Sequence, residues 1–319
     1  MNIEIITTKD ENSAESGFGT IKTCNSLSDS INLMGHNVII DICQTLEELK
    51  KVVERKPDLV ILAVKHILSK DGKIIWLSEF FAENKINFSG SLKDTLMFGS
   101  DKVLAKSYLK DKGISTPRYF TAIPGEYTRD YDIPINYPLI LKPIHTGNYN
   151  YKEEYTPVCN FAEFESQVLS LHALFKVPVL VEEYLDGQDF IVSIIKAKNG
   201  EMLVSAIELV TAKPDKRMLL LDEVAKKENI KELIHIEDKV IRNRVKNLAI
   251  DAYIDLQIRD FGQIDIKSNK SGHCYFMQAN LLPSMTEEMS YFLKAFNMEL
   301  GLSYDEVIGL IVDEGISRV

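Results

Sequence analysis

Two short segments in the last quarter of the chain constrain its fold most: residues 263–265 (Gln-Ile-Asp) and residues 278–284 (Gln-Ala-Asn-Leu-Leu-Pro-Ser), one hairpin apart. Because side chains alternate between the two faces of a strand, Gln278 and Asn280 point to the same face. Pairing of the two strands places them beside Asp265. One carboxylate and two amides are oxygen ligands that a Mg²⁺ ion accepts. The segments therefore predict a β-hairpin that carries a candidate metal site.

Length and charge limit the class of protein. A chain of 319 residues is too long for one small core and suits two or three subdomains. The net charge of -10 argues against a nucleic-acid binder, since phosphate contacts need a concentrated basic surface. Residues 1–6 have no basic leader region, and no apolar run approaches the roughly 18 residues that span a bilayer. We therefore expect a soluble, cytoplasmic protein that binds neither nucleic acid nor membrane.

The first third of the chain alternates between strand-like and helix-like patterns, which is typical of an α/β unit. One helix is predicted to begin after Thr45, because Glu48 three residues later gives the spacing of a capping box. A later helix is predicted to contain Trp76 and Phe80. The expected strands are residues 2–7, 37–41 and 58–64.

The rest of the chain predicts a mixture of helices and strands. A helix begins at residue 101 and stops at Gly113, and a long amphipathic helix over residues 238–256 precedes the hairpin. The further strands are expected at residues 118–123, 138–142, 178–183, 190–195 and 202–210.

Two more segments lie upstream of the hairpin. Lys142 stands in Pro-Leu-Ile-Leu-Lys-Pro (138–143), and Val-Glu-Glu-Tyr-Leu (181–185) follows another apolar run. This order resembles the ATP-grasp ligases, and within them D-alanine:D-alanine ligase, over nearly the full length. The resemblance implies an α/β (α+β) fold in which an N-terminal Rossmann-like unit precedes two ATP-grasp subdomains that clamp ATP. It also implies a homodimer. The implied boundaries are 1–95, 96–185 and 186–319.

The resemblance also assigns residues to the nucleotide. Lys102 and Lys142 are expected to contact the phosphates, Glu182 the exocyclic amine of adenine, and Asp189 the ribose. A lysine at a strand end is by itself usually a solvated side chain, so the joint order and spacing carry this assignment. The remaining ATP candidates are Glu183, the backbone of Tyr184 and Leu185, and Lys226 from a loop that closes over the phosphates.

The candidate metal ligands depart from the family pattern of Asp, Glu and Asn, since this chain has Asp265, Gln278 and Asn280. A neutral amide in place of a carboxylate lowers the charge of the site, so one of two Mg²⁺ ions should bind more weakly. Gln263 stands where relatives usually carry an arginine that stabilises the reaction intermediate, and it brings a hydrogen-bond donor without charge. Arg259 could compensate, with a surface ion pair as its ordinary alternative.

The substrate positions differ as well. Glu15, in a Ser-Ala-Glu tripeptide, is expected to hold the amine of the first substrate. Its usual serine and tyrosine partners are replaced by Asn148 and Lys227, and Ser284 replaces a glycine after the proline of the hairpin segment. We therefore do not expect the enzyme to join two D-alanines.

Two functions remain open. The first is an ATP- and Mg²⁺-dependent ligase that joins an amino-acid-like or peptide-like acid to an amine through an acylphosphate, with Glu15, Gln263 and Lys226 as catalytic residues. The second is a non-catalytic or nearly inactive relative that binds nucleotide or serves as a partner subunit, suggested by the missing charges at Gln263 and Gln278. A Rossmann-type dehydrogenase is disfavoured, because the sequence contains no G-x-G-x-x-G motif.

Overall fold

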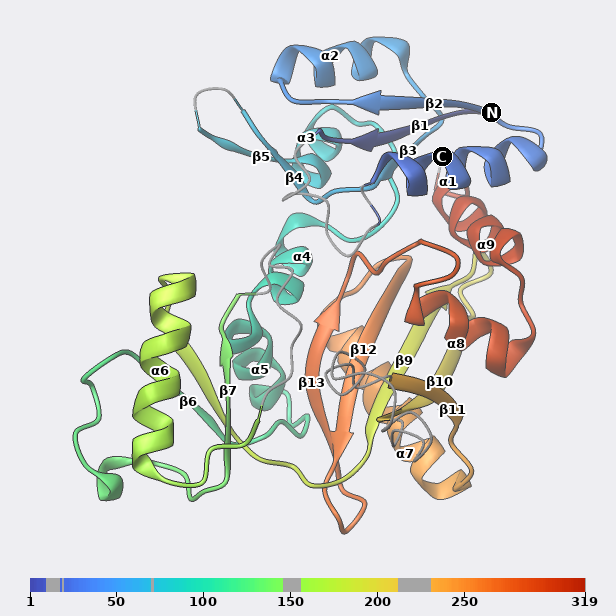
Figure 1. Ribbon diagram of the computed structural model, residues 1–319. Helices are drawn as coiled ribbons and strands as arrows, with labels where there is room; N and C mark the ends of the chain where they lie inside the picture. Colours follow the sequence, from blue (N-terminus) through green and yellow to red (C-terminus); the bar gives the residue numbers. More distant parts are fainter. Residues whose placement is uncertain (10–17, 19, 70–71, 146–155, 212–230, 319) are drawn as a thin grey trace, which may run out of the picture.

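The structure, a computed structural model, describes residues 1–9, 18, 20–69, 72–145, 156–211 and 231–318. Within these residues the strands form three larger sheets and one two-stranded hairpin, with helices packed against them (Figure 1). The predicted mixed α/β (α+β) class is confirmed. None of the helices in these ranges combines the length and the apolar composition that a bilayer crossing requires.

The first sheet is parallel and belongs to an α/β unit. Its elements are β1 (Asn2–Thr7), α1 (Ile21–Leu33), β2 (Asn37–Ile42), α2 (Leu46–Arg55) and β3 (Leu59–Leu62). The strand order is β2-β1-β3, and every residue of β3 is buried, as its continuous apolar run predicts. Thr45 accepts the N–H of Glu48, and the Glu48 carboxylate accepts the N–H of Thr45 at 2.9 Å. The predicted capping box at the start of α2 is thus confirmed.

A short antiparallel hairpin follows, made of β4 (His66–Leu68) and β5 (Ile74–Trp76), and it leads into α3 (Leu77–Glu83). The prediction that Trp76 lies within a helix was wrong, whereas Phe80 does lie in α3. Trp76 pairs with His66 across the hairpin, and the two ring centroids are 5.3 Å apart. This cross-strand ring contact favours the extended conformation at Trp76, so the helix starts one residue later.

Two helices, α4 (Lys93–Ser100) and α5 (Lys102–Asp111), carry the chain into the central unit. Asp101 lies between them and caps α5, because one of its carboxylate oxygens accepts the N–H groups of Val103 and Leu104, each at 2.9 Å. The predicted helix start at residue 101 is thus confirmed to within one residue.

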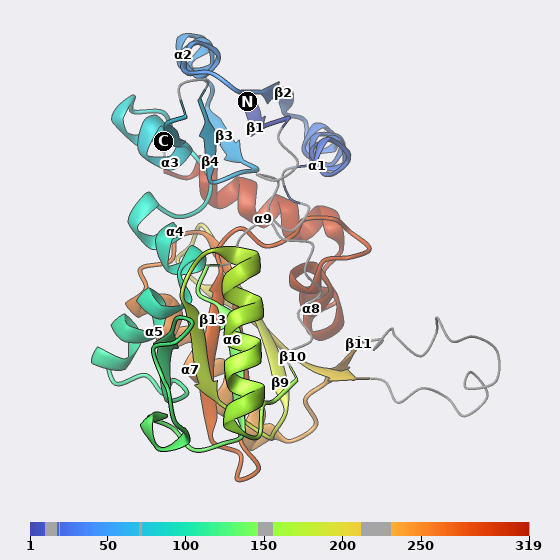
Figure 2. The same ribbon diagram turned by 60° about the vertical axis from the view of Figure 1, so that its left-hand side comes forward.

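The central unit has an antiparallel sheet with one helix on it. Its elements are β6 (Tyr119–Ala122), β7 (Leu139–Pro143), α6 (Phe161–Phe175) and β8 (Val179–Glu183). The strand order is β6-β8-β7, and α6 covers one face of the sheet (Figure 2). Leu139 and Leu141 are buried in the core that this helix closes. Because β7 alternates, Ile140 and Lys142 lie on the opposite face.

The C-terminal unit is built on a five-stranded antiparallel sheet of order β11-β10-β9-β12-β13. Its strands are β9 (Asp189–Lys196), β10 (Met202–Thr211), β11 (Lys231–His235), β12 (Phe261–Ser268) and β13 (Cys274–Asn280), and its helices are α7 (Lys239–Asp255), α8 (Tyr291–Leu300) and α9 (Tyr304–Ile316). Ile264 and Ile266 of β12 share a buried core with α7. Gln263 and Asp265 therefore lie on the other face of β12. The predicted hairpin of β12 and β13 is confirmed.

The last helix, α9, packs against the first sheet rather than only against its own unit. Residues of β1, β3, α1, α8 and α9 share one hydrophobic core. Gly315 sits so close to β3 that a Cβ atom on it would lie 2.8 Å from Cδ2 of Leu59. Asn87 Nδ2 donates a hydrogen bond to the carbonyl oxygen of Gly315 at 2.6 Å. Helix α9 thus completes a core that includes β1 and α1. The domain boundaries 1–95, 96–185 and 186–319 stay predictions.

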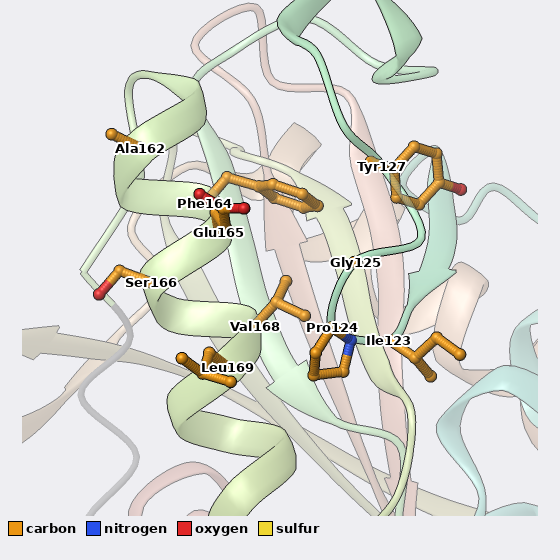
Figure 3. Close-up of a pocket in the computed structure, with 10 residues that line it drawn as sticks. All are labelled: Ile123, Pro124, Gly125, Tyr127, Ala162, Phe164, Glu165, Ser166, Val168 and Leu169. Carbon is orange, nitrogen blue, oxygen red and sulfur yellow. The ribbon is translucent and has the colours of Figure 1, made fainter.

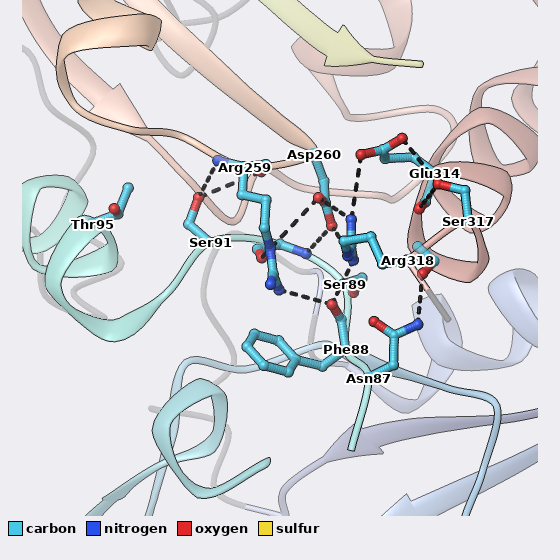
Figure 4. Close-up of polar contacts among 12 residues, drawn as sticks. Asn87, Phe88, Ser89, Ser91, Thr95, Arg259, Asp260, Glu314, Ser317 and Arg318 are labelled. Atoms are coloured by element: carbon cyan, nitrogen blue, oxygen red, sulfur yellow. Dashed lines mark hydrogen bonds and ion pairs between the residues drawn. The ribbon is translucent and has the colours of Figure 1, made fainter. Parts of the chain in front are cut away.

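A buried aspartate, Asp260, connects the loop at Gly90 to Arg318, which follows α9 (Figure 4). Its carboxylate accepts hydrogen bonds from both Nη atoms of Arg318, at 2.5 and 3.0 Å, and from the N–H of Gly90 at 2.7 Å. Arg259 donates to the carbonyl oxygens of Gly90 and Phe88 and stacks on the Phe88 ring at 4.2 Å. Arg259 is therefore neither a surface ion pair nor a compensating charge at the candidate metal site, but part of this junction.

Candidate active site

A cavity of about 400 Å³ separates the central sheet from the C-terminal sheet. Lys142 and Glu182 line it from the central sheet, and Gln263, Asp265 and Gln278 line it from β12 and β13. The residues of the two walls are 81 or more positions apart in the sequence. The structure thus brings the two groups of predicted residues to one cleft.

Most of the predicted site residues line this cavity, with some exceptions. Lys102 is buried at the first turn of α5, and Asn280 lies at the end of β13, and neither belongs to the lining. Glu15 and Lys226 lie outside the described residues. The other predicted residues of the lining are Glu183, Tyr184, Leu185 and Asp189. Their roles in binding stay predictions.

Glu182 is held between two lysines at the back of the cleft. Its Oε1 lies 2.8 Å from Nζ of Lys106, and its Oε2 lies 3.1 Å from Nζ of Lys142. The pair with Lys142 follows from the sheet register, in which Ile140 faces Glu182 and Lys142 is its diagonal neighbour. Burial alone would raise the pKa of Glu182, but Lys106 and Lys142 outweigh it and lower that pKa to about 2. Glu182 is thus an anion that orients both lysines.

Lys106 is a buried lysine beside the candidate site that was not predicted from the sequence. Its side chain is fully buried, and its Nζ also donates to the carbonyl oxygen of Phe276 in β13 at 3.3 Å. It therefore connects the central unit to the hairpin of the C-terminal unit. Its position four residues after Lys102, on the same face of α5, was the available signal. Burial lowers the pKa of Lys106, Glu182 opposes this, and the charges of Lys142 and Lys102 add to the lowering.

The segment after Glu182 is fixed by contacts within the central unit. Glu183 accepts hydrogen bonds from the backbone N–H and the Nε of Arg118, both at 2.8 Å. The N–H of Tyr184 donates to the carbonyl oxygen of Pro138 at 3.1 Å. The N–H of Tyr184 is therefore already used within the central unit. Of the two residues whose backbone is predicted to contact adenine, Leu185 is the better candidate.

Asp189, the predicted ribose contact, begins β9 and lies opposite Lys267 of β12. The Lys267 Nζ is 2.7 Å from Oδ2 of Asp189, and both residues line the cavity. The Asp189 side chain is 52% exposed, so this is a weak, screened pair that a ligand can replace. Asp189 thus keeps an acceptor within reach of a ligand in the cleft.

Asp265 and the two glutamines form the opposite wall of the cleft. Gln263 Nε2 donates to Asp265 Oδ1 at 2.8 Å, and Gln278 Nε2 donates to Asp265 Oδ2 at 2.7 Å. The hairpin register explains this, because Gln278 lies directly opposite Asp265, and Gln263 lies two residues away on the same face. Both oxygens of the carboxylate are therefore occupied by amide donors.

These residues do not fit a divalent-cation site made by the protein itself. Asp265 is the one carboxylate among the three predicted ligands, and Asn280 Oδ1 accepts the backbone N–H of Leu282 at 3.2 Å. Across the described ranges, no group of three or more His, Cys, Asp or Glu side chains is placed to hold a metal ion. Mg²⁺ prefers carboxylate oxygens together with substrate phosphates. The predicted Mg²⁺ site thus has one formal negative charge before nucleotide binds, and both oxygens of that carboxylate already accept amide hydrogens.

A second cavity, of about 380 Å³, lies on the outer side of the central unit (Figure 3). It is formed by α6 and the segment that follows β6, and its walls include Ile123, Pro124, Phe164 and Val168. None of the predicted site residues lies there. The cavity between the two sheets is therefore the candidate active site.

Gly187, which joins β8 to β9, allows the close approach that shapes this cleft. A Cβ at this position would lie 2.5 Å from both the carbonyl oxygen and Oγ of Ser268. We expect Gly187→Ala to lower the free energy of unfolding by about 1–3 kcal/mol and to weaken nucleotide binding, because the segment would be pushed away from β12. Urea denaturation and a nucleotide titration measure the two effects.

The matched control is Gly309→Ala in α9, where a Cβ would lie at an ordinary 3.5 Å from Met34 Cε. This helical replacement should be neutral or slightly stabilising. Equal effects of the two replacements would contradict the proposed packing at Gly187.

Comparison with known proteins assigns the family. A sequence profile described as "D-ala D-ala ligase C-terminus" matches residues 109–313. The chain belongs to this family. Among curated relatives, the D-alanine--D-alanine ligase of Aquifex aeolicus is 26% identical over 295 residues, which cover 92% of this chain and 94% of that ligase. That of Marinomonas sp. is 24% identical over 290 residues, or 91% and 85% of the two chains.

Solved ligase structures show the same fold. The D-alanine--D-alanine ligase of Bacillus anthracis complexed with ATP superposes with a TM-score of 0.77 at 20% identity, covering 100% of this chain and 98% of that one. The VanG D-Ala:D-Ser ligase of Enterococcus faecalis gives a TM-score of 0.72 at 18% identity, with 98% and 99% covered. The predicted resemblance to the D-Ala-D-Ala ligase family and the ATP-grasp fold are confirmed.

Proposed function

We propose that this member of the ligase family is an ATP-dependent ligase that joins a carboxylate to an amine. The acid is first phosphorylated by the γ-phosphate of ATP, which releases ADP. The amine then attacks the carbonyl carbon of the acylphosphate, and inorganic phosphate leaves. The substrates are amino-acid-like or peptide-like small molecules other than two D-alanines, as the replacements at Asn148, Lys227 and Ser284 suggest.

One observation carries this proposal: a cluster of lysines at one wall of the cleft. Lys102 and Lys142 both lie within electrostatic reach of Lys106, and Glu182 binds Lys106 and Lys142. Lys142 itself lines the cavity. A nucleoside triphosphate carries several negative charges, and lysines bind phosphates as point charges.

The chain's own residues would divide the work between the two walls. Lys142 would hold the phosphates, while Leu185 and Asp189 would contact the base and the ribose. Gln263 has a second amide hydrogen besides the one that it gives to Asp265, and this hydrogen would be donated to the oxyanion of the intermediate. Glu15 and Lys226 are proposed to hold the amine and to cover the phosphates.

We also propose a homodimer and a need for Mg²⁺, both of which rest on the family. The proposed cytoplasmic location rests on the sequence. The hairpin does not fit a preformed cation site.

The test is release of ADP by the purified protein with ATP, Mg²⁺ and pairs from a panel of amino acids. We expect at least one pair to stimulate ADP release, and we expect Lys142→Met to reduce the rate about 100-fold or more, because it removes a phosphate contact. Lys110→Met, on the exposed side of α5, is the matched control and should keep the rate. Absence of stimulation by every pair at saturating ATP would exclude the ligase.

A second function, a nucleotide-binding subunit without turnover, is favoured by the two amides that hold Asp265. Calorimetry of ATP binding together with the ADP assay separates the two. Binding without turnover would select the second function, and turnover would select the first.

A further inference from the structure

Asp265 is bound on both sides by amides, and the direction of these bonds is fixed. An ionised carboxylate only accepts hydrogen bonds, so Gln263 and Gln278 must each turn the nitrogen of the amide toward it. Each amide therefore presents its partial positive charge, and not its oxygen, to Asp265. The two glutamines thus compete with a cation for both oxygens of this carboxylate.

The charges along β12 are also unlike those of a cation site. Gln263, Asp265 and Lys267 follow one another at every second position and all line the cavity. Asp265 is the one carboxylate among these three residues, and the charge of Lys267 is paired with Asp189 of β9 at 2.7 Å. A divalent cation bound here would therefore meet a single carboxylate of the hairpin and would have to displace an amide from it. Each such charge-assisted hydrogen bond weakens competing cation binding by roughly tenfold or more.

We propose that Gln263 and Gln278 form an amide clamp that substitutes for a divalent cation at Asp265. The hairpin by itself then binds no cation, and a cation in the cleft is held by the nucleotide phosphates alone, one for each nucleotide. The statement about the nucleotide rests on the proposed function, whereas the statement about the hairpin does not.

The test counts bound Mn²⁺, a paramagnetic substitute for Mg²⁺, by electron paramagnetic resonance on the full-length protein. The samples contain millimolar Mn²⁺, with or without a non-hydrolysable ATP analogue. The wild-type protein is expected to bind no Mn²⁺ alone and one Mn²⁺ per bound analogue. Binding of Mn²⁺ without the analogue, or of two Mn²⁺ ions with it, would overturn the clamp.

Gln278→Glu gives a second, independent measurement. It places a carboxylate where the amide nitrogen is now 2.7 Å from Asp265 Oδ2, so two negative charges face each other. We expect this variant to bind Mn²⁺ without nucleotide, and its Tm to rise by about 3 °C or more when Mn²⁺ replaces a chelator. The matched control is Gln278→Met, which removes the hydrogen bond without adding charge and should show no Tm response to Mn²⁺.

The outcomes separate this inference from the proposed function. If Gln278→Glu binds no more Mn²⁺ than the wild-type protein, the clamp is not what excludes the cation, and the inference fails. If no variant binds the analogue, the proposed function fails, while the nucleotide-free Mn²⁺ count still decides the clamp. If Gln278→Glu does not fold, the wild-type count decides it alone.

Discussion

Replacement of Lys106 by methionine is expected to lower the free energy of unfolding by about 3–5 kcal/mol, the usual result of removing one partner from a buried ion pair. Lys106 and Glu182 are both essentially inaccessible to solvent and lie 2.8 Å apart, so the remaining carboxylate would keep Lys142 as its one ion-pair partner among the described residues. Lys142 would then be drawn toward Glu182 and away from the cleft. We therefore expect weaker nucleotide binding as well, measured by calorimetry beside urea denaturation.

Two controls test the cause of this effect. The double replacement Lys106→Met with Glu182→Gln removes the buried charge together with its partner, and it should recover much of the lost stability. Lys110→Met makes the same replacement on an exposed position of the same helix and should change stability by less than about 0.5 kcal/mol. Equal losses in the single and double variants would show that packing, and not charge, explains the effect.

The acid limb of the stability curve reports on the same carboxylate. The pKa of Glu182 falls from its ordinary 4.5 to about 2 in the folded protein, so its contribution is complete above pH 4.5 and is lost as the pH falls toward 2. Glu182→Gln should flatten this part of the curve relative to the wild-type protein.

Asp260→Asn is the second large effect that we expect, a loss of about 3 kcal/mol in the free energy of unfolding. Asparagine keeps the shape of the side chain and tolerates the left-handed backbone of Asp260, whose φ is 64°. What disappears is the negative charge between Arg318 and Arg259. The contact between the loop at Gly90 and the end of α9 would loosen, and hydrogen exchange should show faster opening of the first sheet.

The control is Asp313→Asn, the same replacement one turn before the end of α9. Asp313 is 55% exposed and pairs with Lys198 at 3.5 Å on the surface. A surface pair of this kind contributes at most about 1 kcal/mol. A loss as large at Asp313 as at Asp260 would mean that buried charge has no special role at this junction.

Much of the fold could be predicted from local patterns. The hairpin of β12 and β13 follows from alternation, and its register places Asp265 opposite Gln278 as expected. Trp76 was misplaced because its preference for helix or strand was decided by a ring contact with His66, which lies ten residues earlier. This contact depends on the pairing of β4 with β5, which the pattern of apolar residues does not predict.

Many residues of the candidate site could be predicted, but the hydrogen bonds and ion pairs among them could not. The resemblance to the ATP-grasp ligases predicted Lys142 and Glu182, and the strand pattern predicted Asp265; all three line one cleft. The sequence does not show that Lys106 is buried against Glu182, because burial depends on packing between two units. Likewise, Gln278 was expected to be a weak metal ligand, whereas its amide donates to the carboxylate that was to share the ion.

The packing of α9 on the first sheet has a consequence for biosynthesis. The ribosome releases β1, β3 and α1 early, yet the helix that covers their apolar side follows more than two hundred residues later. Until then Leu59 and its neighbours stay open to wrong partners, as in other incompletely made domains. We therefore expect the N-terminal core to reach its final packing only after α9 has been made.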